Sequence, residues 1–190
     1  MNTELCFGQR IDPENNLIEC WLTHSALDEI KSMDLSDKNV LMYGAGLGDA
    51  WLAKRCKSLT VIERNEDWLY KAAENCGRNG AFVNYIHRPC NDSDGKADYY
   101  CEIPSDKDYH VIINDDAYRT EVVFKAIEYF KSKQYNGILI CDNWWQDYVW
   151  KSPAAIEALS GYESHIYSQP DHTNFEEPGC EWKTAIHFIK

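Results

Sequence analysis

Three glycines and a downstream acid are the residues whose spacing points most directly to chemistry. Gly44, Gly46 and Gly48 follow the apolar run 40–43, and Glu63 ends a second apolar run 19 residues after Gly44. Glycine has no Cβ atom, so the backbone can turn sharply there and lie close against a ligand. An acid at about this distance accepts hydrogen bonds from ribose hydroxyls. The pattern therefore predicts a site for a cofactor that carries a nucleoside.

The spacing of the glycines also argues against one class of cofactor, the dinucleotides. Dinucleotide-binding turns have the form G-x-G-x-x-G, in which the third glycine lets a helix pack closely beside a pyrophosphate. Here the third glycine comes one position earlier, and Asp49 occupies the place of the expected glycine. Because an acid at a helix N-terminus repels a pyrophosphate, the turn favours a cofactor without phosphate groups.

Acidic and amide side chains follow two further apolar runs. Asn114, Asp115 and Asp116 end one run, and Asp142 and Asn143 end the next. The carboxyl ends of parallel strands share one edge of a sheet, so we expect these side chains to converge. Such oxygen clusters suit Mg²⁺ or Ca²⁺, and a bound cation would lower the pKa of a substrate hydroxyl. Alternatively, Asp115 contacts the cofactor directly, whereas Asp142 and Asn143 only shape a turn. The candidate metal ligands are Asp115, Asp142 and Asn143, and the candidate catalytic residues are Asp115 and Asp142.

Aromatic side chains follow the second of these acidic clusters. Trp144, Trp145, Tyr148 and Trp150 either form the wall of a substrate pocket or fill the end of the core. The loop 170–179 is long enough to cover a site.

The elements that must position these residues alternate between strands and helices. This alternation predicts an α/β sheet with parallel strands. The last two expected strands, 162–168 and 183–189, have no helix between them, so one of them must run antiparallel. We expect one domain over 1–190, with an N-terminal segment and helix over 1–36 and the core over 37–190. The other expected strands are 40–43, 59–63, 82–87, 109–114 and 137–141, and the expected helices are 49–56, 66–76, 121–130 and 153–159.

Composition and net charge argue against some classes of binding partner. The 190 residues carry a net charge of −12 and no sustained basic run, which argues against nucleic acid and against an anionic membrane surface. No signal peptide opens the chain, and no apolar run approaches membrane-spanning length. Eight cysteines without a C-x-x-C pair indicate a reduced, cytoplasmic protein. The sequence leaves the oligomeric state open, a homodimer included.

The G-x-G-x-G turn, together with the order of strands and helices, resembles the class I S-adenosylmethionine-dependent methyltransferases. This resemblance extends from about residue 37 to the C-terminus. It implies a Rossmann-like α/β sandwich, with a mostly parallel seven-stranded sheet, an antiparallel C-terminal strand and helices on both faces. The runs 18–24, 63–68, 111–119 and 137–143 are also similar to a group of small, poorly characterised bacterial methyltransferases. Asp115 with Asp142 and Asn143 is similar to the metal site of the catechol and caffeoyl-coenzyme A O-methyltransferases.

The resemblance implies that S-adenosyl-L-methionine is the cofactor and that a small-molecule hydroxyl is the methyl acceptor. Within it, Glu63 receives the ribose, and Asn91 or Asp92 faces the edge of the adenine. The residues assigned to the cofactor are Tyr43, Gly44, Ala45, Gly46, Gly48, Glu63, Arg64, Asn91 and Asp115.

Three positions depart from the family patterns. Met42 stands where most of these enzymes carry an acid, and Asp116 stands where the bacterial group carries a glycine. Tyr118, followed by Arg119, occupies the position of a lysine in the catechol-type enzymes. Either Asp49 or Asp115 replaces the missing acid, or the cofactor binds weakly. Two alternatives therefore stay open: a degenerate, non-catalytic module for binding or regulation, and an aminopropyltransferase that uses decarboxylated cofactor.

Overall fold

The computed structural model describes residues 9–91, 95–133, 135–144, 153–170 and 181–190. The predicted loop 170–179 lies outside these ranges except for its first residue. None of the helices in the described part of the chain combines the length and the apolar character needed to cross a membrane.

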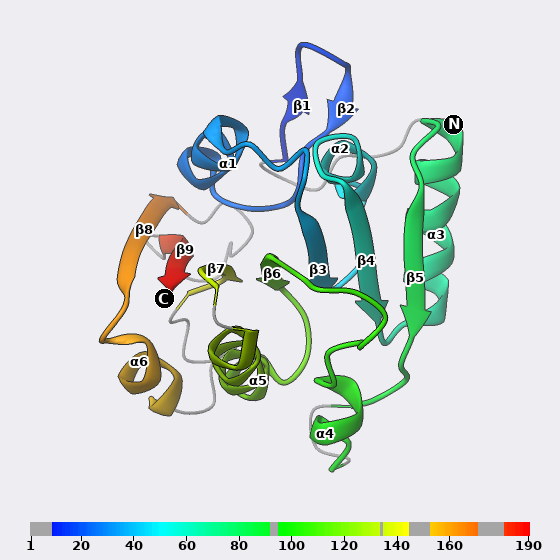
Figure 1. Cartoon of the computed structure of the whole chain (residues 1–190). Helices are drawn as coiled ribbons and strands as arrows, with labels where there is room; N and C mark the ends of the chain where they lie inside the picture. The colour runs from blue at the N-terminus through cyan, green and yellow to red at the C-terminus, as the bar shows by residue number, and fades with distance from the viewer. Residues whose placement is uncertain (1–8, 92–94, 134, 145–152, 171–180) are drawn as a thin grey trace.

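A seven-stranded sheet forms the centre of the structure (Figure 1). Its strands are β3 (Asn39–Tyr43), β4 (Ser58–Glu63), β5 (Val83–His87), β6 (Val111–Asn114), β7 (Gly137–Asp142), β8 (Glu163–Pro170) and β9 (Glu181–Ile189). The strands lie in the order β5-β4-β3-β6-β7-β9-β8. The five strands from β5 to β7 pair in parallel, whereas β9 is antiparallel to both of its neighbours. The predicted sheet with an antiparallel C-terminal strand is therefore confirmed.

Helices cover both faces of the sheet because the central strands are apolar on both sides. Successive side chains of β3 point to opposite faces. Val40 and Met42 join a buried cluster with α1, α2 and α3, while Leu41 and Tyr43 join a cluster with α4, α5 and α6. The helices are α1 (His24–Ser32), α2 (Asp49–Ala53), α3 (Glu66–Arg78), α4 (Ala97–Tyr100), α5 (Arg119–Lys133) and α6 (Ala154–Leu159).

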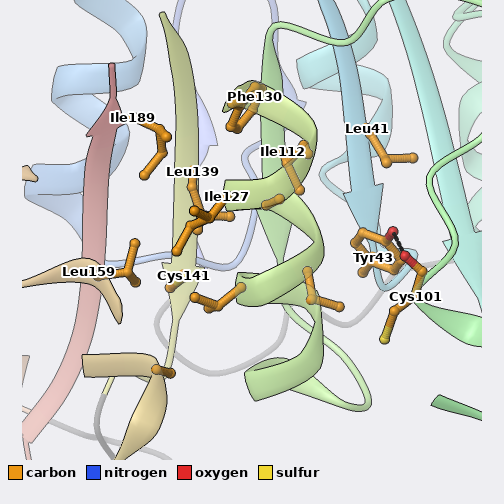
Figure 2. Packing of buried hydrophobic residues seen from close by; sticks show 14 of the residues in the cluster. Leu41, Tyr43, Cys101, Ile112, Ile127, Phe130, Leu139, Cys141, Leu159 and Ile189 are labelled. Carbon is orange, nitrogen blue, oxygen red and sulfur yellow. Dashed lines mark hydrogen bonds between the residues drawn. The ribbon is translucent and has the colours of Figure 1, made fainter. Parts of the chain in front are cut away.

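The second cluster fixes the position of α5 over the middle of the sheet. Figure 2 shows Ile127 and Phe130 of this helix beside Ile112, Leu139 and Cys141 of the strands. Helix α5 begins two residues earlier than the sequence pattern predicts, at a residue that makes hydrogen bonds to both β6 and β7. The start of the helix is thus set by a tertiary contact rather than by its apolar face.

Several local features differ from the sequence prediction. Helix α2 ends at Ala53 rather than at residue 56, and α4 lies in a segment for which no helix was predicted. The predicted helix 66–76 continues to Arg78, because Gly77 keeps a helical backbone and the chain turns only at Gly80, where φ is +62°. A two-stranded hairpin, β1 (Ile11–Asp12) with β2 (Leu17–Ile18), precedes α1 and was not predicted. Its strands are too short to give an alternating pattern that a sequence can reveal.

A buried acid links the hairpin to α1 through ion pairs. Glu19 is fully buried, and its carboxylate forms ion pairs with Arg10 at 2.9 Å and with Lys31 of α1 at 2.5 Å. The following residue, Cys20, lies directly against Gly48, where a Cβ atom would be only 2.4 Å from the Cys20 Cα. Gly48 is therefore required so that the N-terminal segment can rest on the start of α2.

This contact predicts opposite effects for two glycine substitutions. Gly48→Ala should lower the free energy of unfolding by roughly 1–3 kcal/mol, because the new methyl group meets backbone atoms that cannot rotate away. Gly77→Ala, the matched control in α3, should raise it by about 0.5–1 kcal/mol, since nothing lies within 4 Å of the added atom. Urea unfolding followed by circular dichroism would measure both. Equal stability of the two variants would show that the segment does not press on Gly48.

Candidate functional site

A cavity of about 370 Å³ opens at the carboxyl ends of β3, β6 and β7. The turn 45–49 forms one side of it, and the ends of β6 and β7 form another. Gln9, Cys20 and Trp21 of the N-terminal segment also line it. The size falls within the range of small-molecule sites, and its place at the strand ends is where α/β sheets bind ligands.

The three glycines of the turn have three different roles. Gly44 adopts a φ of +97°, and a Cβ atom there would be 2.6 Å from the Asp115 carbonyl oxygen. Gly48 packs directly against the backbone of Cys20, as described above. Of the three, only Gly46 leaves room for a side chain, because a Cβ atom there would make only ordinary contacts, the nearest with the Asp49 carboxylate at 3.8 Å. Gly46 is therefore the position at which a ligand can approach the backbone most closely.

Glu63 lies behind the turn rather than on the wall of the cavity. Its two carboxylate oxygens accept hydrogen bonds from the backbone N–H groups of Ala45 at 2.7 Å and Asn65 at 2.6 Å. Burial raises the pKa of this carboxyl, the charge of Asp116 adds to the rise, and the backbone donors oppose it. The Arg64 N–H is a third backbone donor to this carboxylate, so three of its roughly four acceptor positions are already used. The role of Glu63 toward a ribose stays a prediction, but its contact with Ala45 shapes the turn directly.

Asp49 supports the same turn from the side of α2. It is fully buried, and it accepts hydrogen bonds from the Gly46 N–H at 3.0 Å and from the Tyr85 hydroxyl at 2.9 Å. Burial is the main cause that raises its pKa from 3.8 to about 7, and these hydrogen bonds oppose the rise. Asp49 lines the cavity together with Met42, the residue that replaces the usual acid.

Arg119 joins the ends of β6 and β7. Its Nη1 donates hydrogen bonds to the backbone carbonyl oxygens of Asn114 at 3.2 Å and Asp142 at 2.7 Å. Its Nη2 donates to the side-chain oxygens of Asp115 at 2.9 Å and Asn143 at 3.1 Å. The predicted convergence of the two acidic clusters is thus real, and a guanidinium lies at its centre.

These residues do not fit the predicted divalent metal. One Asp115 oxygen and the Asn143 side-chain oxygen already accept hydrogen bonds from Arg119. One Asp142 oxygen accepts from the Trp182 indole N–H at 3.0 Å and from the Thr184 hydroxyl at 2.8 Å. Across the described residues, no group of three or more His, Cys, Asp or Glu side chains is arranged to hold a metal ion. The geometry therefore gives no support to Mg²⁺ or Ca²⁺ at this position.

Asp115 and Asp142 form a buried carboxyl pair. Their side chains share a hydrogen bond, and burial raises the pKa of both above the usual value for an aspartate. The Arg119 guanidinium opposes the rise at Asp115, whereas the charge of Asp115 adds to the rise at Asp142. Of the two, Asp115 is therefore the carboxyl that ionises more easily, and Asp142 holds its proton more firmly.

Tryptophans form the apolar part of the cavity. Trp21 and Trp182 meet edge to face with ring centroids 6.2 Å apart, and the Trp68 indole N–H donates to the Ala45 carbonyl oxygen. The sequence analysis did not assign Trp21 or Trp182 to the site. The sequence signal that existed for Trp21 was its place in the segment that resembles the bacterial group. Trp182 lies in β9, one residue before the strand 183–189 that the alternation predicts.

The aromatic residues that the sequence did single out are placed differently. Trp144 is buried and contacts the ring of His187 edge to face at 4.8 Å, and it is not among the residues that line the cavity. Trp145, Tyr148, Trp150 and Asp92 lie outside the described residues.

Five residues assigned to the cofactor do not line the cavity: Gly44 and Glu63, described above, and Tyr43, Arg64 and Asn91. Tyr43 points into the core, where its hydroxyl donates to the Cys101 carbonyl oxygen at 2.9 Å (Figure 2). Arg64 forms an ion pair with Asp116 at 2.9 Å. The backbone carbonyl oxygen of Asn91 accepts from the hydroxyl of Tyr118 at 2.6 Å. The charge of Asp116 also raises the pKa of Glu63, so the Arg64–Asp116 ion pair lies near that carboxyl.

Comparison with solved structures identifies the fold. The structure resembles an rRNA methylase from Streptococcus thermophilus, with a TM-score of 0.56, 15% identity and coverage of 88% of this chain and 96% of that one. An N-methyltransferase from Bradyrhizobium japonicum, solved with S-adenosyl-L-homocysteine, matches at a TM-score of 0.57 and 12% identity, covering 90% and 89%. A methyltransferase-like protein from Silicibacter pomeroyi matches at 0.59 and 13%, covering 89% and 88%. No protein-family model and no curated protein matches the sequence. The fold is that of the class I methyltransferases, as the sequence resemblance predicted.

The buried Asp49 predicts how stability responds to pH. Its pKa is raised in the folded state, so its contribution is fully present below about pH 4 and is lost as the pH rises through 7. Asp49→Asn keeps an acceptor for Gly46 and a polar partner for Tyr85, yet it does not ionise. From pH 5 to pH 8, the wild type should lose roughly 3 kcal/mol relative to this variant. Urea unfolding at both pH values measures the difference, and parallel curves would contradict the proposed burial of Asp49.

Proposed function

We propose that this chain, which has the class I methyltransferase fold, is an S-adenosylmethionine-dependent methyltransferase that acts on a small molecule. The observation that carries the proposal is the cavity at the strand ends, which borders the open face of Gly46 and contains carboxyl groups from three elements. When bound, S-adenosylmethionine supplies an electrophilic methyl group on a sulfonium.

The charges of the cavity suit a ligand with two cationic centres. S-adenosylmethionine carries a positive sulfonium and an ammonium, and carboxyl groups with aromatic rings attract such cations. Asp49 supplies a carboxyl that is not paired with Arg119, and Trp21 and Trp68 supply rings at the same cavity. We infer that Asp49 or Asp115 takes over the role of the acid that is missing at Met42.

The acceptor that we propose is a small-molecule hydroxyl. Asp115 and Asp142 provide a carboxyl pair at the strand ends, where a carboxylate can take the proton of a bound hydroxyl. Presenting the acceptor oxygen in line with the methyl group would account for much of the rate, since orientation removes a large entropic cost. The net charge of −12 supports a small molecule over a polyanionic acceptor.

One observation favours a second candidate, a module that binds a ligand without catalysis. Both oxygens of Glu63 already hold backbone N–H groups, and the ion pair of Arg64 with Asp116 lies beside it. A ribose would have to share these acceptors. Binding of cofactor without release of S-adenosylhomocysteine, across panels of phenols, aliphatic alcohols and amines, would favour this candidate.

A graded series at Gly46 tests the cofactor site. Calorimetry should detect S-adenosylhomocysteine binding to the wild type, and Gly46→Ala should already raise the Kd, because the new Cβ atom takes up space in which the ligand would lie against the backbone. Gly46→Val should weaken binding at least tenfold, because its methyl groups enter the cavity, while Tm stays within a few degrees of the wild type. No heat with S-adenosylmethionine or S-adenosylhomocysteine at millimolar concentration would refute the proposed function.

Glu63 gives an independent test of the nucleoside end. Glu63→Gln should raise the Kd for S-adenosylhomocysteine roughly tenfold to a hundredfold, as expected for the loss of one charge-assisted hydrogen bond. The control is Glu66→Gln in the first turn of α3, where an exposed carboxylate accepts a hydrogen bond from the Tyr70 hydroxyl at 3.3 Å. An unchanged affinity in the Glu63 variant would remove this residue from cofactor binding.

A further inference from the structure

We propose that Arg119 is the resident cation of this site, in the place where the sequence pattern predicts a divalent metal, and that the site works without a metal. In this proposal Arg119 is a positioning residue, because it acts through the groups that it holds. Its meaning for catalysis rests on the proposed methyltransferase function. The role of Arg119 in holding the two strand ends together does not depend on that function, and it is tested without any assay of activity.

The hydrogen bonds of Arg119 show how it replaces a metal. A metal at this position would draw together oxygens from the ends of β6 and β7. Arg119 does the same with four N–H bonds, two to backbone carbonyl oxygens and two to side-chain oxygens of Asp115 and Asn143. Both strand ends contribute one oxygen of each kind. The planar guanidinium is suited to this task because its donors have a fixed geometry.

Burial makes the guanidinium an effective barrier to a second cation. The side chain of Arg119 is only 9% exposed, and that of Asp115 is 23% exposed. Charges in such surroundings are poorly screened, so a divalent ion at Asp115 or Asn143 would be repelled strongly. The carboxylate of Asp115 is also already neutralised by its ion pair, which leaves less attraction for a metal.

Two residues beside these contacts have an uncommon backbone conformation, one directly before Arg119 and one directly after β7. Tyr118, which precedes it, has a φ of +52°, and Asn143 has a φ of +48°. Left-handed conformations are uncommon for residues other than glycine, and they persist where surrounding contacts fix them. The structure thus places an unfavourable backbone conformation at each of the two strand ends that the guanidinium joins.

The consequence concerns the acceptor. Without a metal, no Lewis acid lowers the pKa of an acceptor hydroxyl. The carboxyl pair of Asp115 and Asp142 must then take the proton, and Arg119 keeps Asp115 oriented toward β7 for that purpose. An acceptor that is nucleophilic without a metal, such as an acidic phenol, fits this arrangement best.

The experiment measures metal binding and stability in the wild type, Arg119→Ala, Arg119→Lys and the control Arg78→Ala. Arg78 is an exposed residue of α3 whose guanidinium pairs with Glu74 at 2.5 Å. Tryptophan-sensitised terbium luminescence reports a metal near Trp182, because the indole of this residue donates to Asp142. Thermal unfolding is recorded with EDTA, with magnesium chloride and with calcium chloride.

The wild type, Arg119→Lys and Arg78→Ala should show no terbium signal, and neither metal should change their Tm. Arg119→Ala should have a lowered Tm in EDTA and should gain a terbium signal, because Asp115, Asp142 and Asn143 then face one another without a cation. Calcium at a hundredfold excess over its Kd should raise the Tm of this variant by roughly 5–10 °C. If Arg119→Ala folds only in the presence of calcium, that result also supports the proposal.

Two results would overturn the proposal. One is a terbium signal in the wild type that Asp142→Asn abolishes, since this would reveal a metal site beside the intact arginine. The other is an Arg119→Ala protein with the Tm of the wild type and no response to metal. The guanidinium would then not stabilise the ends of β6 and β7. If Arg119→Ala fails to fold under every condition, a metal response in Arg119→Lys would count against the proposal, and its absence would support it.

Discussion

The shape of the candidate site depends on two buried carboxyls that hold consecutive N–H groups of one turn. Glu63, at the end of β4, accepts from Ala45, and Asp49, at the start of α2, accepts from Gly46. Two acids on opposite sides of the turn thus fix the direction of its peptide planes. The open face of Gly46 exists because these planes are held in this way. Burial of both acids has a cost, which their hydrogen bonds to backbone donors partly offset.

The sequence was sufficient to predict the features that follow from topology. Parallel strands bring their carboxyl ends to one edge, so the order of strands along the chain was enough to place the glycine turn, Asp115 and Asp142 together. The divalent metal prediction failed to gain support for a physical reason. The clustering of oxygens was anticipated correctly, but nothing in the spacing shows that Arg119 would donate four hydrogen bonds into the cluster.

Other parts of the site could not have been predicted from a single sequence. Trp21 and Trp182 are far apart in the chain, and they meet only because the N-terminal segment crosses the end of β9. The hairpin that leads to this crossing is made of two-residue strands, and Glu19 fixes its place through ion pairs with Arg10 and Lys31. Contacts of this kind depend on side-chain direction and on long-range packing, neither of which leaves a periodic pattern.

The N-terminal segment makes the cavity depend on contacts between distant parts of the chain. The Thr23 N–H donates to the Thr184 hydroxyl across a separation of 161 residues, and the His24 N–H donates to the Gln169 side chain across 145. Contacts between such distant parts of a chain form slowly, because the entropy of closing a long loop must first be overcome. One wall of the cavity therefore exists only in molecules in which the N-terminal segment and the last strands of the sheet are both in place. A ligand that binds there would select fully folded molecules and discriminate against partly folded ones.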